Sequence, residues 1–160
     1  MHPNAERVCD ALRAAGCDAE VVQLDVPAPT AATAAAALGT TADRIANSLV
    51  FVAGDDPILV LTSGANRVDL KRVGELLGAK VRRADPETVR TATGFPIGGV
   101  PPLGHATPLR VLVDRDLLAH ETVWAAAGTP HAVFEVPPAE LLRVTGGTPA
   151  DVRVEPAAGG

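Results

Sequence analysis

The stretch SLVFVAGDDPILVLT, residues 48 to 62, decides the fold of this chain. It consists of two apolar runs, 48–53 and 57–62, that are rich in valine, leucine and isoleucine and are separated by Gly-Asp-Asp. Apolar runs of this length around a short turn are typical of two antiparallel strands. We therefore predict a β-hairpin over this stretch.

Cap residues and glycines mark further elements on both sides of the hairpin. Thr30 and Asp85 are expected N-caps, Pro86 is an expected first helical residue, and Gly39 and Gly94 are expected helix stops. The predicted helical segments are 4–15 (capped by Asn4), 30–39, a short turn over 41–46, an amphipathic helix with the stripe Leu70, Val73, Leu76 and Leu77, 85–94 and 137–147. The other predicted strands are 20–26, 80–84, 109–114, 122–128 and 131–136.

This order of elements does not alternate strictly between strand and helix, which disfavours a doubly wound parallel sheet. An α+β (mixed α/β) fold fits better, with a curled, mixed, barrel-like sheet flanked by helices. At 160 residues the chain has the length of one domain. We expect that domain over residues 1–147 and a frayed tail over 148–160.

The composition is that of a globular protein with an aliphatic core. Hydrophobic residues make up 47% of the chain, but its only aromatic residues are Trp124 and three Phe. No apolar run is long enough to span a membrane and no signal peptide opens the chain, so we expect a cytoplasmic protein without a membrane partner. Cys9 and Cys17 are too few for a disulfide framework and the four histidines are scattered. The sequence thus predicts no metal site and no cofactor.

The net charge of −5 argues against a generic nucleic-acid binder and against a DNA partner. However, seven of the fourteen basic residues lie between residues 67 and 90, where four acidic residues leave a net charge of +3. This window is either an ordinary solvated face or a local patch that contacts phosphate groups.

The stretch GFPIGGVPPLGH, residues 94 to 105, holds four glycines and three prolines and can be neither a helix nor a central strand. A connecting loop rarely needs so much control of the backbone, which favours a loop shaped around a ligand. No P-loop, nucleophile elbow or dinucleotide-binding fingerprint accompanies it. On these motifs alone the chain is either an enzyme or a binding module.

Four segments then occur in order along nearly the whole chain. They are SLVFV at 48–52, SGANRVDL at 63–70, TGFPIGGVPPLGH at 93–105 and WAAAGTP at 124–130. Together they resemble the YbaK/prolyl-tRNA-synthetase-associated editing domain family, and Gly-Gly-x-x-Pro-x-Gly in the loop is the most telling motif. The resemblance implies that fold and the metal-free hydrolysis, in trans, of the ester between a wrong amino acid and its tRNA, most often tRNA for proline.

The resemblance also implies which residues form the site. The main-chain amides of Gly98 and Gly99 are expected donors to the developing oxyanion, because glycine lets the backbone approach the substrate closely. The substrate-binding residues carried over from the family are Thr30, Ser63, Gly64, Asn66, Pro102, His105, Gly128, Thr129, Pro130 and His131.

Asn47 departs from the family pattern. Similar proteins carry a lysine at this point, just before the central strand, where it is thought to contact the terminal phosphates or to order the substrate. Asn47 is therefore a candidate catalytic position, but its side chain carries no charge. The loss of one charge-assisted bond to a phosphate costs roughly 1.5–3 kcal/mol. Arg44 is a candidate to compensate for it.

A trans-editing deacylase is the leading interpretation of the sequence. Asn47 motivates the alternative, a catalytically impaired protein that binds aminoacyl-tRNA or an aminoacyl-nucleotide, and a hydrolase of another aminoacyl ester or thioester is a weaker third. The expected partner is a mischarged aminoacyl-tRNA, and participation of an aminoacyl-tRNA synthetase is left open. We expect a monomer, because no long exposed apolar stripe is evident.

Overall fold

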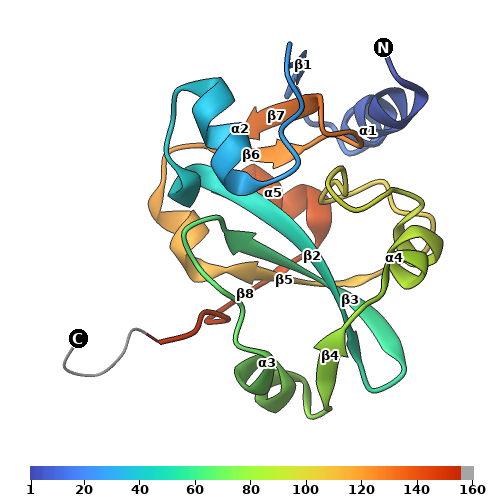
Figure 1. Ribbon diagram of the computed structural model, residues 1–160, viewed down its shortest axis with the longest axis vertical. Helices are drawn as coiled ribbons and strands as arrows, with labels where there is room; N and C mark the ends of the chain where they lie inside the picture. The colour runs from blue at the N-terminus through green and yellow to red at the C-terminus, as the bar shows by residue number, and fades with distance from the viewer. Residues whose placement is uncertain (156–160) are drawn as a thin grey trace.

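The hairpin lies at the centre of one mixed sheet. In the computed structural model, which describes residues 1–155, β2 (Ile45–Ala53) and β3 (Asp56–Ser63) pair antiparallel as predicted (Figure 1). The other strands are β1 (Val21–Gln23), β4 (Val81–Arg83), β5 (Arg110–Asp114), β6 (Val123–Ala126), β7 (Ala132–Val136) and β8 (Thr148–Ala150). The sheet order is β1-β7-β6-β2-β3-β5-β8, and β4 pairs separately with β2. This mixed order confirms the predicted fold class.

The helices begin and end largely where the cap residues predict. They are α1 (Pro3–Ala14), α2 (Ala31–Leu38), α3 (Leu70–Leu77), α4 (Pro86–Thr93) and α5 (Pro138–Thr145). Thr30 forms a capping box on α2 and Asp85 accepts from the first turn of α4. Gly39 and Gly94 follow these helices in the left-handed conformation, at φ 68° and 79°. No helix within the described residues is long and apolar enough to cross a membrane.

Two boundaries differ from the sequence prediction. The N-cap of α1 is His2 rather than Asn4, because Pro3 suits the first helical turn and His2 Nδ1 accepts from the Asn4 N–H (3.0 Å). The helical turn predicted before the hairpin is only a 3₁₀ helix, Ala42–Arg44, because the β-branched Ile45 already pairs with β6 as the first residue of β2.

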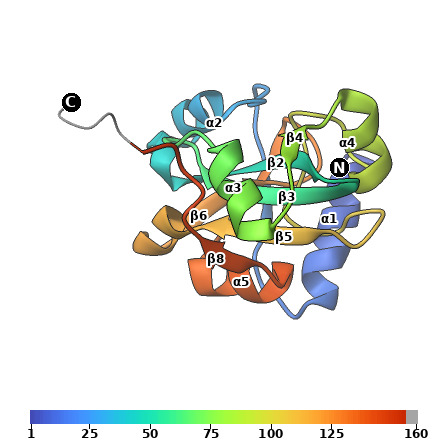
Figure 2. The same cartoon turned by 90° about the horizontal axis from the view of Figure 1, so that it is seen from below.

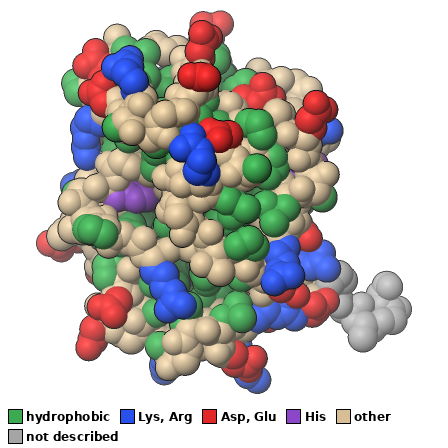
Figure 3. Space-filling view, turned by 180° about the vertical axis from the view of Figure 1, so that it is seen from behind, with side chains coloured by type: hydrophobic (Ala, Val, Ile, Leu, Met, Phe, Trp, Pro, Cys, Tyr) green, Lys and Arg blue, Asp and Glu red, His purple; other side chains and the backbone are tan. Residues whose placement is uncertain are grey.

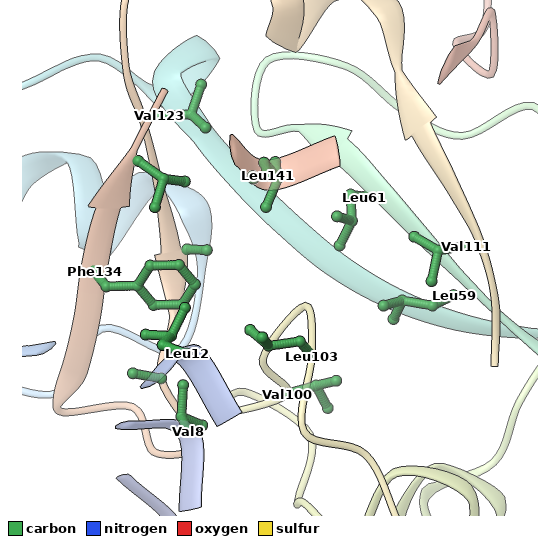
Figure 4. Packing of buried hydrophobic residues seen from close by; sticks show 14 of the residues in the cluster. Val8, Leu12, Leu59, Leu61, Val100, Leu103, Val111, Val123, Phe134 and Leu141 are labelled. Atoms are coloured by element: carbon green, nitrogen blue, oxygen red, sulfur yellow. The ribbon is translucent and has the colours of Figure 1, made fainter. Parts of the chain in front are cut away.

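Helices cover both faces of the sheet. Figure 2 shows α2 and α4 on one side of β2 and β3 and α5 on the other. The largest hydrophobic cluster joins apolar side chains of α1, α5, β3 and β7 (Figure 4). Val100 and Leu103 of the glycine-rich loop are buried in this cluster. These two side chains anchor the loop against the sheet.

The C-terminal segment is ordered further than the sequence predicted. β8 pairs parallel with β5, and Val152 is fully buried among residues of the second hydrophobic cluster. The frayed tail predicted from residue 148 is therefore wrong for residues 148–155, because a free strand edge and an apolar cluster provide partners for them. Residues 156–160 of the predicted tail lie outside the described residues.

We predict that Val152→Ala lowers the free energy of unfolding by about 2 kcal/mol, because the lost methyl groups leave a cavity. Val154→Ala is the matched control in the same segment, since this side chain is 49% exposed. Its effect should stay within about 0.5 kcal/mol. Urea denaturation followed by circular dichroism measures both, and equal effects of the two variants would contradict the packing of the segment.

Candidate active site

The strand pairing of β2 is interrupted along one edge. Its first edge pairs with β3 from Ala46 to Ala53. On the second edge β6 pairs only with residues 45 and 46, and β4 pairs only with residues 51 to 53. Residues 47–50 therefore have no strand partner on that edge. We call this interval the open edge of β2.

The register shows which backbone groups face the open edge. The Gly64 N–H donates to the Ile45 carbonyl (2.9 Å). The backbone N–H and C=O groups of odd-numbered residues of β2 therefore point toward β3. The Gly54 N–H donates to the Lys80 carbonyl (2.9 Å), so the backbone N–H and C=O groups of even-numbered residues point toward the opposite edge, where β4 lies. Ser48 and Val50 consequently direct their N–H and C=O groups into the gap between β6 and β4. Unpaired backbone groups of this kind are free to bind a ligand.

The side chain of Ser48 adds a further polar group at the same place. Its Oγ is buried and has no hydrogen-bond partner among the described residues. A buried hydroxyl without a partner costs free energy unless a ligand or water satisfies it. Ser48 is therefore a candidate binding residue that the sequence analysis did not name.

A cavity of about 560 Å³ lies at the open edge. Its inner wall is lined by small residues of β2, β6 and β7, among them Ala46, Ala125 and Ala132. The start of α2 and the tip of the glycine-rich loop form further walls, and Trp124 contributes the one indole ring of the chain. The volume and the small apolar residues of this wall suit a ligand of modest size with an apolar end.

Five of the residues predicted from the sequence line this cavity. They are Thr30 at the start of α2, Asn47 on β2, Asn66 after β3, Gly98 in the loop and Thr129 after β6. Segments that are far apart in the sequence thus meet at the open edge. Asn47 is half-buried and lies opposite Thr62 in the hairpin register.

Gly99 and Gly128 lie behind the cavity wall rather than on it. A Cβ at Gly99 would lie 2.9 Å from the Gly128 carbonyl oxygen, and one at Gly128 would lie 2.6 Å from the Asn4 carbonyl oxygen. Both glycines therefore permit close packing of backbone segments. The Gly99 N–H donates to the Pro96 carbonyl (3.2 Å), whereas the Gly98 N–H has no backbone acceptor within residues 1–155. Gly98 is thus the better placed donor of the two.

Ser63 and Gly64 connect β3 to its neighbours and do not line the cavity. The Ser63 Oγ–H donates to the Asp43 carbonyl (3.0 Å) and its N–H donates to Asp114. A Cβ at Gly64 would lie 2.5 Å from Ala31 Cβ, so glycine is required where this turn meets α2.

The remaining predicted residues also lie outside the cavity lining. Pro102 is buried, Pro130 is half-buried and His131 is exposed, with its N–H bonded to the Thr129 hydroxyl (3.1 Å). The His105 ring contacts the Pro101 carbonyl through Nε2 (2.7 Å). Burial lowers the pKa of His105 from its usual value, and the bond to Pro101 opposes that shift.

The basic window identified in the sequence divides into two parts. Arg67 and Arg83 line the cavity and form no ion pair with another described residue. Arg72 is instead paired with Asp151 (3.0 Å) and Glu155 (2.9 Å) in the C-terminal segment. On the face opposite to that of Figure 1, acidic and basic side chains are interspersed (Figure 3). Arg67 and Arg83 are the two cations placed to meet a phosphate near the cavity.

A metal site needs several His, Cys, Asp or Glu side chains close together. Within residues 1–155 no group of three or more His, Cys, Asp or Glu side chains is arranged to hold a metal ion.

Fold and site together define a small mixed α/β domain with a cavity between an interrupted strand edge and a glycine-proline loop. A family model described as the aminoacyl-tRNA editing domain matches residues 25–144. The chain therefore belongs to the aminoacyl-tRNA editing domain family, which confirms the resemblance identified in the sequence.

Individual relatives agree with this assignment. The chain is 35% identical over 123 residues to the uncharacterized protein YwhH of Bacillus subtilis, covering 76% of this chain and 78% of YwhH. It is 36% identical over 97 residues to a proline–tRNA ligase of Nitratidesulfovibrio vulgaris, but this match covers 58% of the chain and only 17% of the ligase. A solved structure described as a proposed trans-editing enzyme for prolyl-tRNA synthetase superposes with a TM-score of 0.93 at 47% identity, over 97% of this chain and 99% of that one.

We predict that His105 makes the stability of the protein decrease at acidic pH. Because its pKa is lowered by folding, the unfolded chain binds the proton first as the pH falls below about 6.5. The stabilising contribution of neutral His105 is thus complete above that pH and is lost below it. Melting temperatures between pH 8 and pH 5 should fall more steeply for the wild type than for His105→Gln, and parallel curves would contradict the assignment.

Proposed function

We propose that this protein hydrolyses the ester bond of mischarged aminoacyl-tRNA in trans, with tRNA for proline as the main acceptor. The observation that carries this proposal is the cavity at the open edge, where Gly98 and the unpaired groups of β2 face the same space. Membership of the editing domain family and the similarity to the trans-editing structure support it.

The geometry is suited to an activated ester that needs little more than placement and oxyanion stabilisation. Water attacks the ester carbonyl, its oxygen joins the carbonyl carbon, the bond to the ribose oxygen breaks, and that oxygen takes up a proton. Negative charge develops on the carbonyl oxygen during the attack. The Gly98 N–H is a fixed donor for this charge, and the N–H groups of Ser48 and Val50 are further donors in the same cavity.

The walls of the cavity suggest how the two ends of the substrate lie. The alanines at positions 46, 125 and 132 favour a small amino-acid side chain, which can pack against their methyl groups. Arg67 and Arg83 contact the phosphates of the tRNA acceptor end. These two arginines supply charge that Asn47 lacks.

The direct test is deacylation of a panel of mischarged tRNAs, beginning with alanyl-tRNA for proline. We expect release of free amino acid that is proportional to protein concentration and fastest for small side chains. The control is the same protein after heat inactivation. Release no faster than in that control, for every member of the panel, would exclude the proposed activity.

We further predict that Asn47→Lys increases kcat/KM by about ten- to a hundredfold, because a lysine adds one charge-assisted bond to the substrate. Thr91→Lys is the matched control: it adds the same charge at an exposed position of α4 that does not line the cavity. Deacylation rates at subsaturating substrate measure both. An unchanged rate for Asn47→Lys would show that position 47 does not limit the reaction.

Asn47 also favours a second candidate function, the binding of aminoacyl-tRNA without turnover. A non-hydrolysable aminoacyl-adenosine analogue distinguishes the two candidates. Tight binding of the analogue by a protein that hydrolyses no member of the panel would favour this second function.

A further inference from the structure

A buried carboxylate behind the cavity has no role in the reaction described so far. Asp114, at the end of β5, is only 1% exposed. Its Oδ2 accepts from the Ser63 N–H (3.0 Å), the Thr62 hydroxyl (3.2 Å) and Asn66 Nδ2 (2.9 Å), and its Oδ1 accepts from the Asp116 N–H (3.0 Å). It forms no ion pair with another described residue. This carboxylate therefore connects the end of β3 to the turn that carries Asn66.

Asn66 lies between this carboxylate and a second one. Its Nδ2 donates to Asp114 Oδ2 (2.9 Å) and to Asp116 Oδ2 (2.8 Å). Carboxylates accept and do not donate, so the NH₂ group must face them and both of its hydrogens are used. Asn66 is also one of the residues that line the cavity. The one polar atom that it has left for a ligand is the acceptor Oδ1.

The C-terminal segment completes this arrangement. Arg153 Nη1 donates to Asp116 Oδ2 (3.0 Å), which holds that carboxylate against Asn66. The Val154 N–H donates to the Arg67 carbonyl (2.7 Å), and Val154 is one of the residues that line the cavity. This segment lies beyond residues 25–144, which the family model matches. The positioning of Asn66 thus depends partly on residues outside the matched span.

On the basis of the proposed function, we propose that Asp114, Asp116 and Arg153 are positioning residues that fix Asn66 Oδ1 as the acceptor for the α-ammonium group of the aminoacyl ester. Among the described residues none that lines the cavity is acidic, so a cation inside it must be met by neutral acceptors. Arg153 neutralises Asp116, whereas the buried charge of Asp114 remains unpaired directly behind the amide. This negative charge favours a cationic donor over a hydroxyl or a nucleobase amine at Asn66 Oδ1.

The test compares two analogues by calorimetric titration of the full chain at pH 6.5. One is 3′-alanylamido-3′-deoxyadenosine, in which a stable amide replaces the ester, and the other is its propionylamido counterpart, which lacks the amino group. We expect the wild type to bind the amino form about tenfold more tightly. Asn66→Ala should lower the affinity for the amino form more than the affinity for the propionylamido form.

Variants of Arg153 test the positioning role separately. Arg153→Ala should reduce the preference for the amino form. Arg153→Lys should retain it, because a lysine keeps the ion pair with Asp116. Arg72→Gln is the matched control: it removes ion pairs with the same C-terminal segment but does not touch Asn66 or Asp116. This variant should keep the wild-type preference, and circular dichroism confirms that each variant is folded.

The outcomes separate this inference from the proposed function. If the wild type deacylates its substrate and binds both analogues but shows no preference for the amino form, the inference about Asn66 is wrong and the proposed function stands. Equal losses of affinity for both analogues in Asn66→Ala would also overturn it. If the wild type deacylates no tRNA, the proposed function itself fails, whichever analogue it binds.

Discussion

The interruption of strand pairing along β2 is the constraint on which the site depends. A central strand ordinarily satisfies its backbone groups on both edges, because an unpaired buried N–H or C=O is costly. Here the pairing of β2 with β6 stops at residue 46, and its pairing with β4 starts at residue 51. The four residues between them face a cavity instead of a strand. The hydrophobic contacts of the hairpin with both layers of helices hold β2 in place despite this gap. The fold therefore provides hydrogen-bonding groups whose positions are fixed before any ligand arrives.

The glycine-rich loop forms one wall of this cavity, and packing against the core holds it there. Val100 and Leu103 fasten its middle to the core, and Gly99 allows it to approach the turn at Gly128 with backbone against backbone. These contacts leave Gly98 at the wall of the cavity. The conformational freedom of the glycines thus serves two purposes, close packing at one residue and a main-chain donor at its neighbour.

Local sequence signals predicted the helices well, because caps such as Thr30 and Asp85 act on their own first turns. The same reasoning failed at the C-terminus, where β8 and Val152 are ordered by partners that are distant in the sequence. The candidate site was predicted in part. Asn47, Asn66 and Gly98 belong to recognisable motifs, but the importance of Ser48 and Asp114 depends on strand register and on side-chain contacts that no short motif encodes. Gly64, Gly99 and Gly128 were assigned to the substrate, whereas the structure places them in backbone packing.

The central claim is that main-chain groups at the open edge and in the loop hold the scissile carbonyl. A crystal structure of the protein with an amide-linked aminoacyl-adenosine analogue tests it most directly. The claim predicts that the analogue carbonyl oxygen lies within about 3.2 Å of the Gly98 nitrogen or of a backbone nitrogen at Ser48 or Val50. A carbonyl bound only by side chains, or an analogue bound outside the cavity, would contradict it.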